Sequence, residues 1–188
     1  MNIRFGVTGA ALFALTACGG GGTGTLVVPY GDLDTEYDAL QPLVLALSTT
    51  TTMPGTGSAG YSGTILIGDD LSTAGTGYLG RAIIGANFQT QTIDGSAGNF
   101  YNVNLDGSGD PDTVIGLVSG SIDIDSVGFS GADGDEFNST LTGTIAGMLI
   151  AGGIDGEFVG ATPLGVVAID DGTATLGGTP QEILLLAD

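Results

Sequence analysis

Apolar and polar side chains alternate along much of the chain after residue 60. The clearest example is residues 137–147, where one face of an extended strand is apolar and the other carries Asn and Thr. Because successive side chains of a strand point to opposite sides, this two-residue period predicts a half-buried antiparallel strand. The apolar face consists of Phe137, Leu141 and Ile145.

Residues 114–125 show the same period, with Val114, Val118, Ile122 and Ile124 on one face. Similar segments predict strands at 61–67, 78–88, 91–95, 99–105, 154–159, 163–169 and 173–177. Turn signals lie between them at Gly68-Asp69-Asp70, Asp94-Gly95, Asp106-Gly107, Asp133-Gly134 and Asp171-Gly172. This spacing predicts an all-β domain, either a barrel or a sandwich. We favour a single eight-stranded antiparallel barrel, because closure leaves no exposed strand edge.

The polar face of these strands distinguishes a soluble barrel from a transmembrane one. A transmembrane barrel carries an outward apolar band with aromatic girdles. Here the polar face is built of Thr, Ser and Asp, there is no Trp, and aromatic residues make up 6% of the chain. The sequence therefore predicts a soluble barrel over residues 53–188.

The segment that precedes the barrel gives a mixed signal. Within residues 34–47, Tyr37, Leu40, Val44 and Leu47 keep helical spacing, but Pro42 interrupts it. Residues 48–60 are a polar, Gly-rich connector. The conformation of residues 25–50 stays open at this point.

The first 18 residues have the pattern of an export signal. Arg4 is followed by an apolar stretch from Gly6 to Ala17, which is too short to span a bilayer but suits a secretory signal. Leu15-Thr16-Ala17-Cys18 resembles the lipobox of bacterial lipoproteins, and Cys18 is the only cysteine. The sequence thus predicts a lipoprotein signal peptide at 1–17. Cys18 is then lipidated and anchors the chain to the membrane, and residues 18–52 form a Gly- and Thr-rich tether and N-terminal extension. The residue after the cysteine is Gly19 and not Asp, which in lipoproteins of this kind favours transport to the outer membrane over retention in the inner membrane.

Charge and missing residue types narrow the function further. The chain has 21 acidic residues against two arginines, and its net charge is −19. Such a charge repels phosphate backbones, so no nucleic-acid partner is expected. The absence of His and Lys removes Ser-His and Cys-His nucleophile pairs, imidazole metal ligands and Schiff-base chemistry. We therefore expect a non-enzymatic protein without cofactor or metal, and a monomer.

Several segments resemble transferrin-binding-protein-B-like lipoproteins. MPGTGSAGYSG (residues 53–63) is similar to the segment that leads into the first barrel strand of these proteins. Residues 80–100 look like their next hairpin. Residues 137–169, with IDGEF at 154–158 and LGVV at 164–167, resemble their closing section. The resemblance covers roughly residues 50–180. It implies an eight-stranded barrel on a lipid tether and, in many relatives, exposure at the cell surface.

Three groups of residues are candidate binding positions. Residues 106–112 (DGSGDPD) alternate oxygen-bearing side chains as calcium loops do, but a hairpin turn with exposed carboxylates is the favoured interpretation. Asp133, Asp135 and Glu136 form a second acidic turn. The third group consists of three tyrosines, Tyr61, Tyr78 and Tyr101. They could line the mouth of the barrel and hold a ligand, or their rings could simply pack in the protein while their hydroxyls stay in contact with water.

Together these features predict an outer-membrane lipoprotein, exposed at the cell surface, that acts as a non-enzymatic binding module. It would capture an extracellular protein or a small molecule in nutrient or iron uptake. Two alternatives stay open: a structural envelope lipoprotein with no specific ligand, and a carrier that holds a small ligand inside the barrel.

Overall fold

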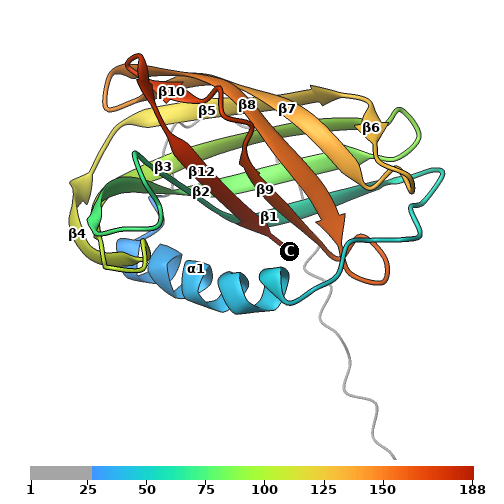
Figure 1. Cartoon of the computed structure of the whole chain (residues 1–188), viewed down its shortest axis with the longest axis horizontal. Coiled ribbons are helices and arrows are strands. Elements are labelled where there is room, and N and C mark those ends of the chain that lie inside the picture. The colour runs from blue at the N-terminus through green and yellow to red at the C-terminus, as the bar shows by residue number, and fades with distance from the viewer. Residues whose placement is uncertain (1–26) are drawn as a thin grey trace, which may run out of the picture.

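A computed structural model describes residues 27–188, and its main body is a closed eight-stranded antiparallel β-barrel (Figure 1). The predicted all-β barrel is confirmed. The strands of the ring are β1 (Ser58–Gly68), β2 (Gly75–Asn87), β3 (Thr92–Leu105), β5 (Gly120–Val127), β7 (Glu136–Ile145), β8 (Met148–Val159), β9 (Gly165–Asp170) and β12 (Glu182–Ala187). Outside the ring lie α1 (Tyr30–Leu45), β4 (Pro111–Leu117), β6 (Phe129–Ser130), β10 (Thr175–Leu176) and β11 (Thr179–Pro180).

The first and last strands of the barrel close the ring. β1 pairs with β2 on one side and with β12 on the other, over the register from Gly63 opposite Ala187 to Gly68 opposite Glu182. A Cβ atom at Gly63 would overlap the carbonyl oxygen of Leu186, so only glycine allows the two strands to approach this closely. Closure gives each of the eight main strands a neighbour on both sides.

The interior of the barrel is filled by side chains. Its inward-facing residues form one continuous core of Ile, Leu, Val, Ala and Phe. At the end near β6, four aromatic rings pack around Phe158, whose ring centroid lies 5.2 Å from that of Phe129 and 5.5 Å from that of Phe137. Tyr61 and Phe88 complete this aromatic cluster at 6.1 and 5.8 Å. An eight-stranded barrel is just narrow enough for side chains to fill in this way.

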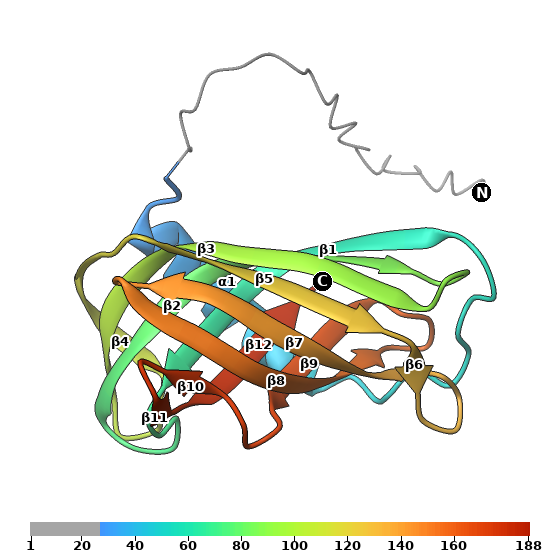
Figure 2. The same cartoon turned by 90° about the horizontal axis from the view of Figure 1, so that it is seen from above.

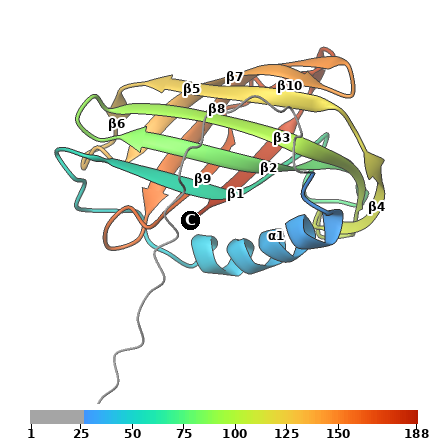
Figure 3. The ribbon, with the colours of Figure 1, turned by 180° about the vertical axis from the view of Figure 1, so that it is seen from behind.

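Helix α1 covers part of the outer wall (Figures 1 and 3). Its buried side chains, Leu33, Tyr37, Leu40 and Val44, recur at helical spacing and pack on the outer faces of β1, β2, β9 and β12 in a second core. The Tyr37 hydroxyl donates to Asp110 at 3.3 Å, and the Arg81 guanidinium pairs with Glu36 at 2.9 Å. Burial of this face offsets the roughly 3 kcal/mol that Pro42 costs inside a helix.

A bulge in β3 decides how its neighbours pair. Asn99 adopts a positive φ of 56°, and the register against β2 shifts between Leu79 and Arg81. The Phe100 ring turns inward here, over Gly80, where any Cβ would overlap it. Beyond the bulge, β3 pairs with β4 along 101–105, and before it with β5 along 92–98.

Three predictions about individual elements were wrong. Asp94-Gly95 is not a turn but lies inside β3, which joins the two strands expected at 91–95 and 99–105. The strand expected at 114–125 is broken into β4 and β5, because the two parts pair with β3 on either side of its bulge. The closing strand β12 was not predicted at all.

The helical spacing around Tyr37 does mark a helix, and Pro42 lies within it. The predicted signal peptide at 1–17, the lipidated Cys18 and the adjoining Gly-rich tether lie outside the described residues. Within 27–188, no helix is both long and apolar enough to cross a membrane.

Truncation of Phe158 tests the aromatic cluster. We expect Phe158→Ala to lower the free energy of unfolding by about 3–5 kcal/mol, because it leaves a cavity among four other rings. The control is Leu149→Ala on the same strand, whose side chain is 64% exposed and whose loss should cost less than about 0.5 kcal/mol. Urea denaturation measures both. Similar losses for the two variants would contradict a filled interior.

Candidate functional site

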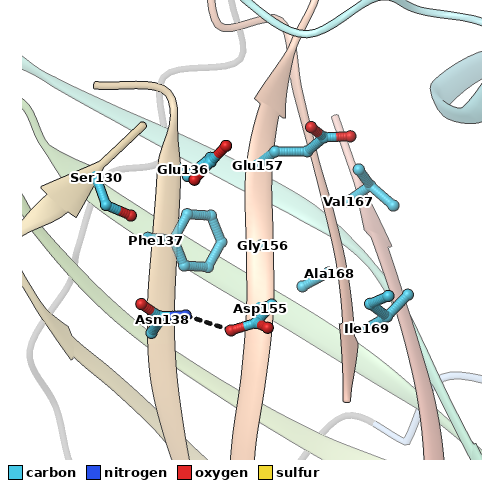
Figure 4. Close-up of a pocket in the computed structure, with 10 residues that line it drawn as sticks. All are labelled: Ser130, Glu136, Phe137, Asn138, Asp155, Gly156, Glu157, Val167, Ala168 and Ile169. Atoms are coloured by element: carbon cyan, nitrogen blue, oxygen red, sulfur yellow. Dashed lines mark hydrogen bonds between the residues drawn. The ribbon is translucent and has the colours of Figure 1, made fainter. Parts of the chain in front are cut away.

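The clearest hollow with mixed polar and apolar lining lies on the outer wall of β7, β8 and β9 (Figure 4). It has a volume of about 400 Å³ and is open to solvent on one side. We call it the acidic groove. Its lining residues are Ser130, Glu136, Phe137, Asn138, Asp155, Gly156, Glu157, Val167, Ala168 and Ile169.

Strand register brings three carboxylates of the groove together. Glu136 on β7 lies directly opposite Glu157 on β8, and one step along the ladder Asn138 lies opposite Asp155. Asn138 donates a hydrogen bond to the Asp155 carboxylate, and the Thr49 hydroxyl donates to Glu157 at 3.1 Å. Each carboxylate is therefore set on a rigid strand and points to the outside of the barrel (Figure 4).

The floor of the groove is apolar. The Phe137 ring turns inward beneath Gly156, where a Cβ atom would overlap it, so only glycine lets the wall lie flat over this ring. On β9, Val167 and Ile169 point outward beside the carboxylates, and Ile169 is 55% exposed. The groove thus combines a negative rim with an aliphatic strip, in which Ile169 is exposed and Val167 is half-buried.

No described basic side chain neutralises this rim. The sequence has no Lys or His, and its second arginine, Arg4, lies outside the described residues. Arg81 is the one basic residue within 27–188, and it is bound to Glu36 on the helix side. Like charges directly opposite each other on paired strands destabilise a sheet. A positive group from outside these residues would relieve the repulsion between Glu136 and Glu157.

The same outer wall is acidic beyond the groove. Asp94 on β3 lies directly opposite Asp125 on β5, and Asp123 is one more outward carboxylate of β5. β5, which carries Asp123 and Asp125, lies on the side of the barrel away from α1 (Figures 1 and 2). The wall consequently presents a negative surface to any partner.

The candidate calcium loop at 106–112 is a hairpin turn. The Asp106 carboxylate accepts backbone N–H groups of Ser108 at 2.7 Å and Asp110 at 3.2 Å. Asp110 accepts hydrogen bonds from Tyr37 and Gln41 of α1. Within the described residues no group of His, Cys, Asp or Glu is arranged to hold a metal ion. The carboxylates of this loop hold the loop and the helix in place.

The three candidate tyrosines do not meet at a barrel mouth. Tyr61 lies inside the barrel and donates to the carbonyl of Pro163 at 3.0 Å, and its burial raises the pKa of its hydroxyl to about 12. Tyr78 packs against the same core six strand positions away, opposite Ile67. Tyr101 points outward and donates to the carbonyl of Val28 at 2.9 Å. Each tyrosine has a packing role.

The second acidic turn contributes one residue to the groove. Glu136 lines it, Asp133 is exposed on the loop, and Asp135 is buried with 6% of its surface exposed. Sequence reasoning missed Asp155, Glu157, Val167 and Ile169 as parts of one site. Their outward positions follow from the two-residue period, but their meeting depends on inter-strand register, which the period does not give.

Comparisons with known proteins add no family to this description. No family model matches the chain, and no curated protein is similar to it in sequence.

Removal of one rim charge tests the electrostatics of the groove. We expect Glu136→Gln to raise the free energy of unfolding by about 0.5 kcal/mol at low salt, because Gln keeps the size of Glu and relieves its repulsion from Glu157. The gain should vanish near 1 M salt, where the screening length falls to about 3 Å. Urea denaturation at both salt concentrations measures it.

Asp123→Asn is the matched control, because Asp123 lies between Ser96 and Thr142 and faces no carboxylate directly. It removes the same net charge from the same wall. An equal gain in both variants would show only relief of the overall charge of −19 and would contradict a specific repulsion between Glu136 and Glu157.

Proposed function

We propose that this protein is an outer-membrane lipoprotein, anchored through lipidated Cys18 and exposed at the cell surface, that binds a partner through the outside of its barrel without catalysing a reaction. The anchor is proposed on the signal-like first 17 residues and on the position of the only cysteine. Surface exposure and a role in nutrient or iron-related capture rest on the resemblance to transferrin-binding-protein-B-like lipoproteins.

The filled interior is the observation that carries the binding mode. A carrier needs an unfilled, mostly apolar cavity. In this barrel the aromatic cluster around Phe158 occupies one end, and the Phe100 ring and a continuous aliphatic core occupy the rest. Recognition at the outer wall is therefore favoured over a small ligand held inside.

The acidic groove indicates the chemistry of the partner. A Lys or Arg side chain carries an apolar stem and a positive head. The stem matches Val167 and Ile169, and the head matches the carboxylates of Glu136 and Glu157. Complementary charge of this kind gives specificity and fast association. We propose a basic protein surface as the partner of this wall.

The absence of catalysis is proposed on the residue inventory. The chain contains no His and no Lys, and Cys18 is assigned to the anchor. The carboxylates of the groove lie on an open sheet face, where water is not excluded from a reacting group. This arrangement suits binding rather than general acid–base chemistry.

Cell fractionation with antibody labelling tests the anchor and the orientation. We expect the wild-type protein in the outer-membrane fraction and labelled on intact cells. Cys18→Ala should leave the outer-membrane fraction, because it lacks the acyl chains that make the attachment stable. Trypsin shaving would be a poor substitute, because Arg81 is the only basic cleavage site after Cys18.

Two results would count against the proposal. Retention of Cys18→Ala in the membrane would contradict the lipid anchor. Labelling of the wild type only after permeabilisation would contradict surface exposure and would favour the structural envelope alternative.

A further inference from the structure

An exposed aliphatic patch lies on β4, at the end of the barrel opposite to β6 (Figures 1 and 3). Val114, Ile115 and Leu117 are 45%, 54% and 53% exposed on one short strand. β4 pairs with β3 and with no other strand of the described chain, so its second edge has no strand partner within residues 27–188. We call these three residues the β4 patch.

The described chain begins beside this patch. The backbone of Val28 is held by Asn99, whose side-chain oxygen accepts its N–H at 3.1 Å and whose side-chain nitrogen donates to its carbonyl at 2.9 Å. The Tyr101 hydroxyl donates to the same carbonyl. Tyr101 is in turn the strand partner of Leu117. Val28 is therefore fixed next to β4, and Val27, with half of its surface exposed, adjoins it.

The length of chain before Val27 limits how far the patch can lie from the anchor. Eight residues lie between Cys18 and Val27, so the two are at most about 30 Å apart at full extension. The 14 residues of β3 extend over about 45 Å. An anchored Cys18 therefore keeps the β4 end within about 30 Å of the membrane, whereas the β6 end can lie a further 45 Å or so away.

We infer that the β4 patch and Val27 rest on the lipid surface to which Cys18 is anchored. This inference rests on the proposed function, because it requires the lipid anchor. Transfer of exposed aliphatic side chains from water to the lipid surface is favourable in free energy. Tyr30 is half-buried, its ring packs against Tyr101 at 5.7 Å, and tyrosine is a residue type that favours a membrane interface. The tether supplies the high local concentration that so small a patch needs.

The charges around the patch select the kind of lipid surface. Asp112 lies on β4 itself, Asp32 lies in the first turn of α1, and Asp34 accepts a hydrogen bond from Tyr30. They would be repelled by anionic head groups, so contact is expected with zwitterionic lipid. In this orientation the acidic groove, at the β6 end, faces away from the membrane and is free to meet a partner.

Tryptophan fluorescence tests the contact, because the chain contains no natural Trp. The mature chain beginning at Cys18 is coupled through that thiol to a maleimide phospholipid in phosphatidylcholine vesicles, which makes the test independent of lipidation in the cell. Leu117→Trp reports on the patch. Leu164→Trp is the matched control, since Leu164 is similarly exposed at 58% and lies in the turn after β8.

We expect brominated phosphatidylcholine to quench Leu117→Trp at least about twofold more than Leu164→Trp, with a blue-shifted emission for the former only. Adding Ile115→Asp to the Leu117→Trp variant should abolish the difference. Equal quenching of both variants, or quenching of neither, would overturn the inference. The result is separate from cell fractionation, which alone decides whether Cys18 is lipidated in the cell.

Discussion

The pairing of β1 with β12 is the constraint on which the rest of the structure depends. It joins residues more than a hundred positions apart, from Gly63 with Ala187 to Gly68 with Glu182, and it turns an open sheet into a ring. Without it both strands would expose a row of unpaired backbone groups, in a chain that has no disulfide to hold it. Closure also places Leu66 opposite Leu184, with Leu186 on the same outer face of β12, and these residues belong to the surface on which α1 packs.

Closure with a filled interior moves recognition to the outside of the barrel. The core around Phe158 and Phe100 leaves the inner face to stability, and α1 takes one part of the outer face. What is left is the acidic wall of β3, β5, β7 and β8, with the groove at Glu136 and Glu157. Repulsion between these two carboxylates lowers stability, as is common where a surface is shaped for a partner. The lipid anchor that we propose would hold the opposite end of the barrel and leave this wall free.

The barrel could be predicted from the sequence because many of its strands have one solvent-exposed face, which makes polar and apolar residues alternate. In β7 the alternation of Phe137, Leu141 and Ile145 with Thr and Asn is visible directly. The alternation is absent in β12, so this strand was not predicted. Its outward Leu184 and Leu186 lie under the helix, and its inward Ile183 and Leu185 face the core, so neither face is polar. Asp94-Gly95 misled for a different reason. Gly95 is required by the close approach of β2, since a Cβ there would crowd the carbonyl of Ile83, and not by a turn.

We propose that the barrel recognises a basic partner at the groove and not a ligand in its interior. The most direct measurement is an NMR titration of the non-lipidated protein, beginning at Gly19, with a short Lys- and Leu-containing peptide. Recognition at the groove predicts saturable chemical-shift changes of the backbone amides at Gly156, Glu157 and Val167. The affinity for the peptide should fall about fivefold in Glu136→Gln/Glu157→Gln and stay unchanged in Asp123→Asn/Asp125→Asn. Shifts centred on the inward residues of the aromatic cluster, or equal weakening in both double variants, would contradict it.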